Sequence, residues 1–378
     1  MSLLSVGYRR GDEMRHEAGV WARLHIDLPL LVGLLLIAGA GLVVLYSAGG
    51  EDMDLVWRQV VRLGLGFAVL VALAQVRPTT LRAWSPWVFS VGLLLLLAVL
   101  FFGEVGKGAQ RWLDLGVVRF QPSELMKLAV PMMVAWFLAE RPLPPTLGRL
   151  LGAALLIVVP VALVVKQPDL GTSLLIAASG AFVLLLAGLR ARIIGILAAL
   201  GAATAPVAWH FLHDYQRQRV MTFLNPENDP LGAGYHIIQS KIAIGSGGLY
   251  GKGWLNGTQS HLDFLPERST DFIFAVFGEE FGFVGVVLLI ALYLFVIGRG
   301  LYIAVRAQDN FGRLVAGSLT LTFFVYLFVN IGMVTGLLPV VGVPLPLISY
   351  GGTSMVTLMA GFGILMSIQT HRKMLAGT

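Results

Sequence analysis

The sequence predicts an all-α polytopic membrane protein with about ten transmembrane helices. Hydrophobic residues make up 57% of the chain and charged residues only 13%, about half the share of a typical soluble domain. The mean hydropathy is +0.80. Apolar segments of membrane-span length recur along the chain, and basic residues gather in alternate connections between them. These observations exclude an ordinary soluble fold.

The predicted spans follow one another with short connections, apart from one long loop between the seventh and the eighth. They are 28–46, 60–76, 84–102, 125–139, 150–165, 170–189, 193–212, 272–297, 314–337 and 348–368. An even number of spans places both ends of the chain on one side of the membrane. We treat residues 1–378 as a single transmembrane domain.

Basic residues decide which side that is. Many of them fall in alternate loops or the C-terminal tail, on the side of the N-terminal arginines: Arg77, Arg82, Arg141, Arg149, Arg190, Arg192, Arg299, Arg306, Arg313, Arg372 and Lys373. Because cytoplasmic loops carry the excess of Lys and Arg, both termini are predicted to be cytoplasmic. Topology thus accounts for the net charge of +6, and nucleic acid is not an expected partner. The chain has no cysteine, so disulfides and thiolate metal sites are excluded.

The long loop, 213–270, lies on the outer face in this topology. Its aromatic and aliphatic content indicates an ordered segment, since loops of this length are usually either functional or disordered. Ile237, Ile238, Ile242 and Ile244 have the spacing of a short amphipathic helix that lies in the membrane interface.

Asp271 closes this loop. Pro266 interrupts the preceding structure, and an apolar run begins directly after Asp271, so the aspartate is predicted at the head of a helix. A helix from 271 to 297 is about 40 Å long against a hydrocarbon core of about 30 Å, which places Asp271 near the lipid headgroups. A carboxylate there faces the polar end of a lipid. The alternative is a helix cap that only satisfies backbone donors.

Two further carboxylates, Glu279 and Glu280, follow about two turns further along the same predicted helix. Two adjacent acidic side chains at that depth require partners, and Lys127 or the arginines of the outer loops are the expected ones. The small residues on this face, Ala275, Gly278 and Gly282, also fit a packing seam between helices.

Ionisable residues cluster around the fourth and sixth spans. Glu124 and Lys127 share a helix face and are predicted to pair, and Asp169 is a candidate third member. This group fits a functional cavity, an ion-pair clamp or a proton-coupled transporter. Arg111 offers a planar donor fork for phosphate, while Trp112 beside it also suits an interfacial aromatic belt.

A proline-rich, uncharged loop, 336–354, precedes the last span. Its three prolines, at 339, 344 and 346, predict a re-entrant or tightly packed plug. Its glycines and serines could also donate to an anion at a helix N-terminus, but packing is the favoured interpretation.

Several stretches together resemble the SEDS family (shape, elongation, division and sporulation). They are RWLDLG (111–116), FQPSE (120–124), QPDLGT (167–172), LPERSTDFIF (265–274) and PLPLISYGG (344–352), and the similarity covers all ten predicted spans. The elongation branch of the family is favoured by GLYGKGWLNGTQS (248–260) and HRKML (371–375).

The resemblance implies a peptidoglycan glycosyltransferase of the bacterial inner membrane. Such an enzyme polymerises lipid II on the outer face into β-1,4-linked glycan strands for elongation and rod shape, and releases undecaprenyl pyrophosphate. The implied partner is a class B penicillin-binding protein, a transpeptidase that cross-links the strands.

The family's essential aspartate maps onto Asp271, which makes it the candidate base for the acceptor's hydroxyl. Glu124, Lys127 and Asp169 would line the central cavity in a supporting role. The leaving pyrophosphate needs cationic donors or a divalent ion such as Mg²⁺ or Mn²⁺, although the sequence requires no cofactor. The candidate donors are Arg111, Arg217, Arg219, Lys241 and Arg268.

Two rival classes share the same spans. A lipid II flippase would use the polar cavity for transport and make no bond, and a scaffold would only localise a cell-wall enzyme. The flippase predicts movement of lipid II without polymer, and the scaffold predicts that a folded Asp271→Ala protein still supports growth.

Overall fold

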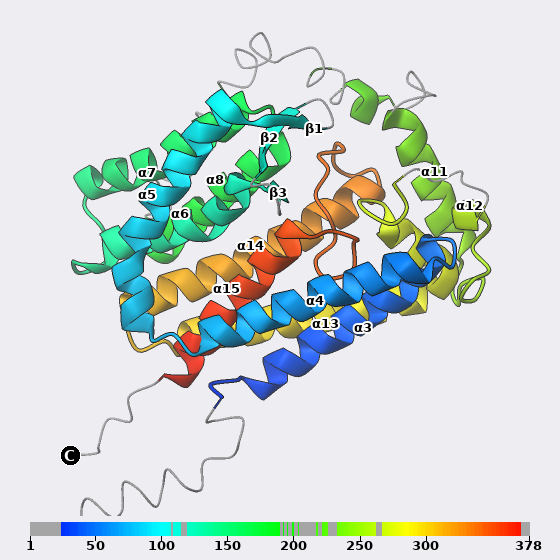
Figure 1. The fold of residues 1–378 in the computed structure, drawn as a ribbon, viewed down its shortest axis with the longest axis horizontal. Helices are drawn as coiled ribbons and strands as arrows, with labels where there is room; N and C mark the ends of the chain where they lie inside the picture. The colour runs from blue at the N-terminus through cyan, green and yellow to red at the C-terminus, as the bar shows by residue number, and fades with distance from the viewer. Residues whose placement is uncertain are drawn as a thin grey trace, which may run out of the picture.

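The computed structural model of the chain describes residues 24–106, 109–114, 119–189, 221–225, 233–261 and 267–371, together with positions 192, 195, 199, 203 and 217. Helices dominate this part of the chain (Figure 1). The long ones are α3 (Leu28–Ala48), α4 (Met53–Ala74), α5 (Pro78–Phe102), α6 (Pro122–Ala139), α7 (Leu147–Lys166), α8 (Leu170–Leu186), α13 (Ile273–Val305), α14 (Asn310–Val334) and α15 (Thr353–Thr370).

Seven helices within the described residues are long and apolar enough to cross a membrane: α3, α4, α5, α7, α13, α14 and α15. Helix α8 is apolar as well but has only 17 residues. The chain is therefore a multi-pass helical membrane protein, as the sequence predicts. Most of the predicted span 193–212 lies outside the described residues, so the count of ten spans and the side of the termini stay predictions.

Helix α14 forms the centre of the bundle. In an 18-residue stretch of α14, 72% of the residues are buried, against 22% for the corresponding stretches of α4 and α7. It packs against α13, α8 and α6, while α4 packs against α15 and α3 against α13. Figure 1 shows the strands, α11 (Ala233–Ser246) and α12 (Thr258–His261) at the end of the bundle opposite to the start of α3 and the end of α15.

The short helix predicted in the long loop is confirmed as α11. Ile237 is only 2% exposed while Ile242 is 46% exposed, so the helix has a buried and an open face. Its buried side packs against α13 and α14. Whether α11 lies in the membrane interface stays a prediction.

The first difference from the predicted fold is a small sheet between α5 and α6. Strands β1 (Glu104–Gly106), β2 (Ala109–Asp114) and β3 (Arg119–Phe120) form antiparallel pairs in the order β1-β2-β3. The strictly all-α prediction is therefore incomplete. The strands are two to six residues long, too short for an alternating pattern to stand out among the turn residues around them.

The second difference is a break in α13. Gly282 has φ 64° and ψ −166°, a conformation that only glycine adopts readily. The broken turn is completed by a neighbouring loop: the amide groups of Phe283 and Val284 donate to the carbonyls of Gly248 (2.9 Å) and Leu249 (3.0 Å). The prediction of an uninterrupted helix from 271 to 297 is therefore wrong. The sequence did not reveal the break, because a backbone conformation that interrupts a helix leaves the hydropathy pattern intact.

The proline-rich loop before α15 is tightly packed, as predicted. Val343, Leu345, Leu347 and Ile348 are each at most 2% exposed. Helix α15 begins at Thr353 rather than at 348, because this packed segment is not helical. The loop brings its buried side chains into the bundle next to the start of α13.

Candidate active site

A polar cavity of about 230 Å³ lies where β2, α6, α8, α14 and the proline-rich loop meet. Five of the residues predicted for the site line it: Arg111, Trp112, Glu124, Lys127 and Asp169. They come from three separate stretches of sequence, so the fold assembles the cluster that the ionisable residues suggested.

Asp169 joins two elements of this cavity wall. Its Oδ1 caps α8 by accepting from the backbone amide of Thr172 (3.2 Å), and its Oδ2 accepts from the side-chain amide of Gln121 (3.1 Å). The guanidinium of Arg111 lies 3.7 Å from the same Oδ2 and donates to the carbonyl of Pro168 (2.6 Å). Asp169 thus holds Arg111 at the cavity, and its carboxylate partly offsets the positive charge of the arginine.

Glu124 and Lys127 form the predicted ion pair on α6. The ammonium of Lys127 lies 2.7 Å from Glu124 Oε1, and both side chains are 6% exposed. Lys127 also donates to the hydroxyl of Tyr326 (2.6 Å), which the sequence analysis did not identify. The second oxygen of Glu124 has no hydrogen-bond partner among the described residues. One carboxylate oxygen of the pair is therefore buried at the wall of the polar cavity without a protein donor.

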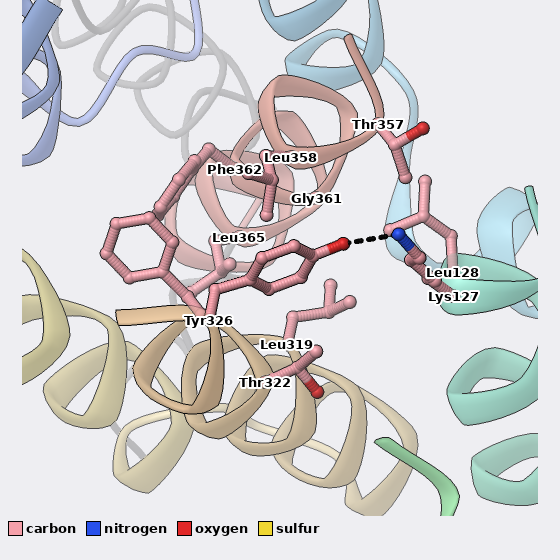
Figure 2. Close-up of a pocket in the computed structure, with 11 residues that line it drawn as sticks. Lys127, Leu128, Leu319, Thr322, Tyr326, Thr357, Leu358, Gly361, Phe362 and Leu365 are labelled. Carbon is pink, nitrogen blue, oxygen red and sulfur yellow. Dashed lines mark hydrogen bonds between the residues drawn. The ribbon is translucent and has the colours of Figure 1, made fainter. Parts of the chain in front are cut away.

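Figure 2 shows this tyrosine on α14, with its hydroxyl directed at Lys127. Between α6, α14 and α15 lies a second, mainly apolar cavity of about 30 Å³, room for about two water molecules. This cavity is too small for a sugar, so the larger one beside it is the candidate substrate site.

Asp271 lies at the edge of the larger cavity. A Cβ atom placed on Gly342, which lines the cavity, would be 3.5 Å from Asp271 Oδ2. The N-cap position of α13 belongs to Phe272, and no side chain caps the helix there. Asp271 thus lies one residue before the N-cap, close to the predicted head of the helix, and its carboxylate lies beside the cavity wall; the capping alternative stays open.

Glu279 and Glu280 lie elsewhere, on α13 and away from the residues that line the cavity. Glu279 is fully buried, and its Oε1 accepts from Lys252 (2.7 Å) and Thr258 (3.1 Å). Glu280 accepts from the hydroxyl of Ser47. Lys127 and the outer-loop arginines are thus not the partner of Glu279. The break at Gly282 brings the loop that carries Lys252 over this face, which the sequence pattern did not reveal.

The remaining predicted donors are not among the residues that line the cavity. Lys241 lies in α11 against Gly336, where a Cβ atom would be 2.8 Å from its ammonium, and Arg268 lies near Gly50 at the end of α3. Arg217 is described only as an isolated position, and Arg219 lies outside the described residues. Their role in substrate binding stays a prediction.

The structure also places a basic residue that the sequence analysis did not single out. Arg62, within α4, stacks over the ring of Tyr350 at 4.3 Å from its centroid. It lies close to Gly352, which lines the cavity. The sequence could have pointed to Arg62, because an arginine inside an apolar span usually faces a cavity or a charged partner.

Metal binding by protein side chains alone finds no support in the described part of the chain. No group of three or more His, Asp or Glu side chains there could hold an ion. The participation of a divalent ion stays a prediction.

Fold and cavity define a polytopic membrane protein with a polar, ion-paired site at one end of its helical bundle. The chain belongs to the FTSW_RODA_SPOVE family of cell cycle proteins, whose model matches residues 22–374. This result confirms the resemblance seen in the sequence motifs.

Similar proteins extend over nearly the whole chain. Peptidoglycan glycosyltransferase MrdB of Escherichia coli (strain K12) is 58% identical over 357 residues, which cover 94% of this chain and 96% of that protein. The protein of the same name from Helicobacter pylori (strain J99) is 38% identical over 371 residues, covering 95% and 93%.

Solved structures agree with the fold. A chain from a peptidoglycan synthase complex that coordinates polymerization and crosslinking matches with a TM-score of 0.80 and 32% identity, over 92% of this chain and 99% of that one. The rod shape determining protein RodA of Thermus thermophilus matches with a TM-score of 0.69 and 30% identity, over 92% and 98%.

Proposed function

We propose that this chain is a peptidoglycan glycosyltransferase that polymerises lipid II into β-1,4 glycan strands and releases undecaprenyl pyrophosphate. Relatives of that name are 58% and 38% identical over almost the full length. The observation that carries the proposal is the position of Asp271, whose carboxylate lies beside Gly342 at the edge of a polar cavity in a membrane bundle. A lipid-linked sugar requires such a site, with a polar chamber next to hydrocarbon.

In this reaction the acceptor's 4-hydroxyl attacks the anomeric carbon of the donor, and the glycosyl–phosphate bond breaks. A sugar hydroxyl is a poor nucleophile at neutral pH, so a carboxylate within hydrogen-bond reach accelerates the step by taking its proton, typically by 10²–10⁴-fold. Asp271 is the proposed base. The carboxyl proton leaves to water, and the leaving lipid pyrophosphate carries the bonding electrons away.

Charge that develops on the pyrophosphate needs donors that are already in position. Arg111 is the proposed donor within the cavity, because Asp169 and the carbonyl of Pro168 hold its guanidinium in place. Lys127 supplies a second positive charge, shared with Glu124. A divalent ion, if required, would have to be held largely by the substrate's phosphates, since the described side chains form no cluster for it.

The proposed setting is the bacterial inner membrane, with the site on its outer face. The proposed partner is a class B penicillin-binding protein that cross-links the product. Support for a partner comes from the similar chain that was solved within a peptidoglycan synthase complex.

A test that separates synthesis from transport uses the purified full chain with fluorescent lipid II. We expect glycan polymer from the wild type, none from Asp271→Ala, and wild-type amounts from the control Asp54→Ala, which removes an exposed carboxylate at the start of α4. Equal polymer from Asp271→Ala would remove this residue from the chemistry. Lipid II movement across vesicles without polymer would favour a flippase, and normal growth with Asp271→Ala would favour a scaffold.

A further inference from the structure

The backbone that leads into Asp271 is held by three consecutive carbonyl groups. The carbonyl of Ser269 accepts from the amide of Tyr350 (2.8 Å), and that of Thr270 accepts from the hydroxyl of Ser349 (2.5 Å). The carbonyl of Asp271 accepts from the side-chain amide of Asn330 (2.9 Å). All three donors belong to α14 or to the loop that follows it, so this segment is tied to the centre of the bundle.

Asn330 makes the bond closest to the proposed base. It is fully buried, and its second amide hydrogen goes to the carbonyl of Val343 (2.8 Å). A side-chain amide has two donor hydrogens, so both are used on two different segments. Val343 follows Gly342, the residue against which the carboxylate of Asp271 lies. One side chain therefore sets the distance between the base and this part of the cavity wall.

Ser349 provides a second anchor of the same kind. Its hydroxyl accepts from the amide of Leu345 (2.8 Å) while it donates to Thr270, so the loop is closed on itself and joined to the residue before Asp271. The carbonyl of Ser349 in turn accepts from Gln59 on α4 (3.1 Å). Ser349 and Gln59 are 4% and 1% exposed. These bonds are shielded from water, so losing one leaves a buried carbonyl without its donor.

We propose that Asn330 is a positioning residue for glycosyl transfer, with Ser349 as its second anchor. Asn330 is out of reach of any substrate because it has no exposed surface, and it acts by fixing the backbone of Asp271 against the cavity wall. A base must lie within hydrogen-bond reach of the proton that it removes, and a displacement of about 1 Å can cost about 10²-fold in rate. This inference rests on the proposed function.

The experiment measures polymerisation of fluorescent lipid II by the purified full chain, with rates normalised to the folded fraction. For Asn330→Ala we expect kcat to fall about 10²-fold while KM stays within about twofold, because the charged side chains that line the cavity are all kept. The matched control is Ser318→Ala, which removes another fully buried side chain of α14 whose hydroxyl donates to a backbone carbonyl, that of Ser179 (2.6 Å). The control should keep the wild-type kcat per folded molecule.

A second pair of variants covers the case in which Asn330→Ala does not fold. Ser349→Ala should lower kcat about tenfold, and Ser349→Thr, which keeps the hydroxyl, should restore it. The inference is overturned if Asn330→Ala or Ser349→Ala keeps the wild-type kcat, if only KM changes, or if Ser318→Ala loses as much kcat. A wild type that makes no polymer would instead refute the proposed function.

Discussion

Removing the positive charge from the Glu124–Lys127 pair should destabilise the protein strongly. In Lys127→Met the ammonium is lost while most of the side chain's volume is kept. Glu124 Oε1 then loses the partner at 2.7 Å, and Oε2 has none among the described residues to begin with. The side chain of Glu124 is only 6% exposed, so water cannot readily replace the lysine.

The size of the effect follows from this geometry. Breaking a buried ion pair on one side typically costs about 3–5 kcal/mol, because an uncompensated charge stays behind. Lys127→Met should therefore lower the free energy of unfolding by about that amount. The double variant Lys127→Met/Glu124→Gln removes both charges and should recover most of the loss. Tyr326→Phe removes only one hydrogen bond to a charged group and should cost about 1.5–3 kcal/mol.

Equilibrium unfolding in mixed detergent micelles measures these differences, and the wild type, Lys127→Met, Glu124→Gln and the double variant together form a double-mutant cycle. The reasoning is refuted if Lys127→Met lies within about 1 kcal/mol of the wild type, or if the double variant is as unstable as the single one. Either result would show that Glu124 finds another partner or that water enters the cavity freely.

Two further predictions concern the backbone break and the end of the bundle. Gly282→Ala should destabilise the protein and slow polymerisation, because the φ of 64° at this position disfavours alanine and a Cβ atom would lie 2.2 Å from the amide nitrogen of Gly251. Unfolding curves of the variant and the wild type would test this prediction, and an unchanged curve would contradict it. His25, just before α3, stacks on His371 at 3.9 Å, and burial, followed by the charge of His371, lowers the pKa of His25 below 6.5. Since the unfolded chain then binds the proton more readily, the stability from this contact is present above about pH 6.5 and is lost as the pH falls. His25→Gln should flatten that part of the stability curve between pH 5 and 7, and an equally steep curve in the variant would exclude His25 as the cause.

Much of the fold could be predicted because membrane spans carry a strong signal. Apolar length located the long helices, and the charges in or next to the predicted spans, Glu124, Lys127 and Asp169, marked the cavity. Charges are costly in a bundle of this kind, so their positions are informative even without spatial data.

The parts that could not be predicted depend on backbone geometry or on contacts distant in sequence. The break at Gly282 does not alter hydropathy, and it decides that Lys252, rather than Lys127, reaches Glu279. Tyr326 and Asn330 each look like one polar residue in an apolar span. Their roles become visible only when residues about 200 positions from Tyr326 and 59 from Asn330 are placed beside them.

The two residues missed on α14 also connect the cavity to the proposed base. Tyr326 and Asn330 are four positions apart, so they project from the same face of the helix about 6 Å apart along its axis. Tyr326 contacts Lys127 of the ion pair, and Asn330 holds the carbonyl of Asp271. Because α14 is the most buried of the seven candidate spans in the described chain, it provides a rigid reference for both groups. The spacing between the cavity's cation and the proposed base is thus set by one helix rather than by the long loop 213–270.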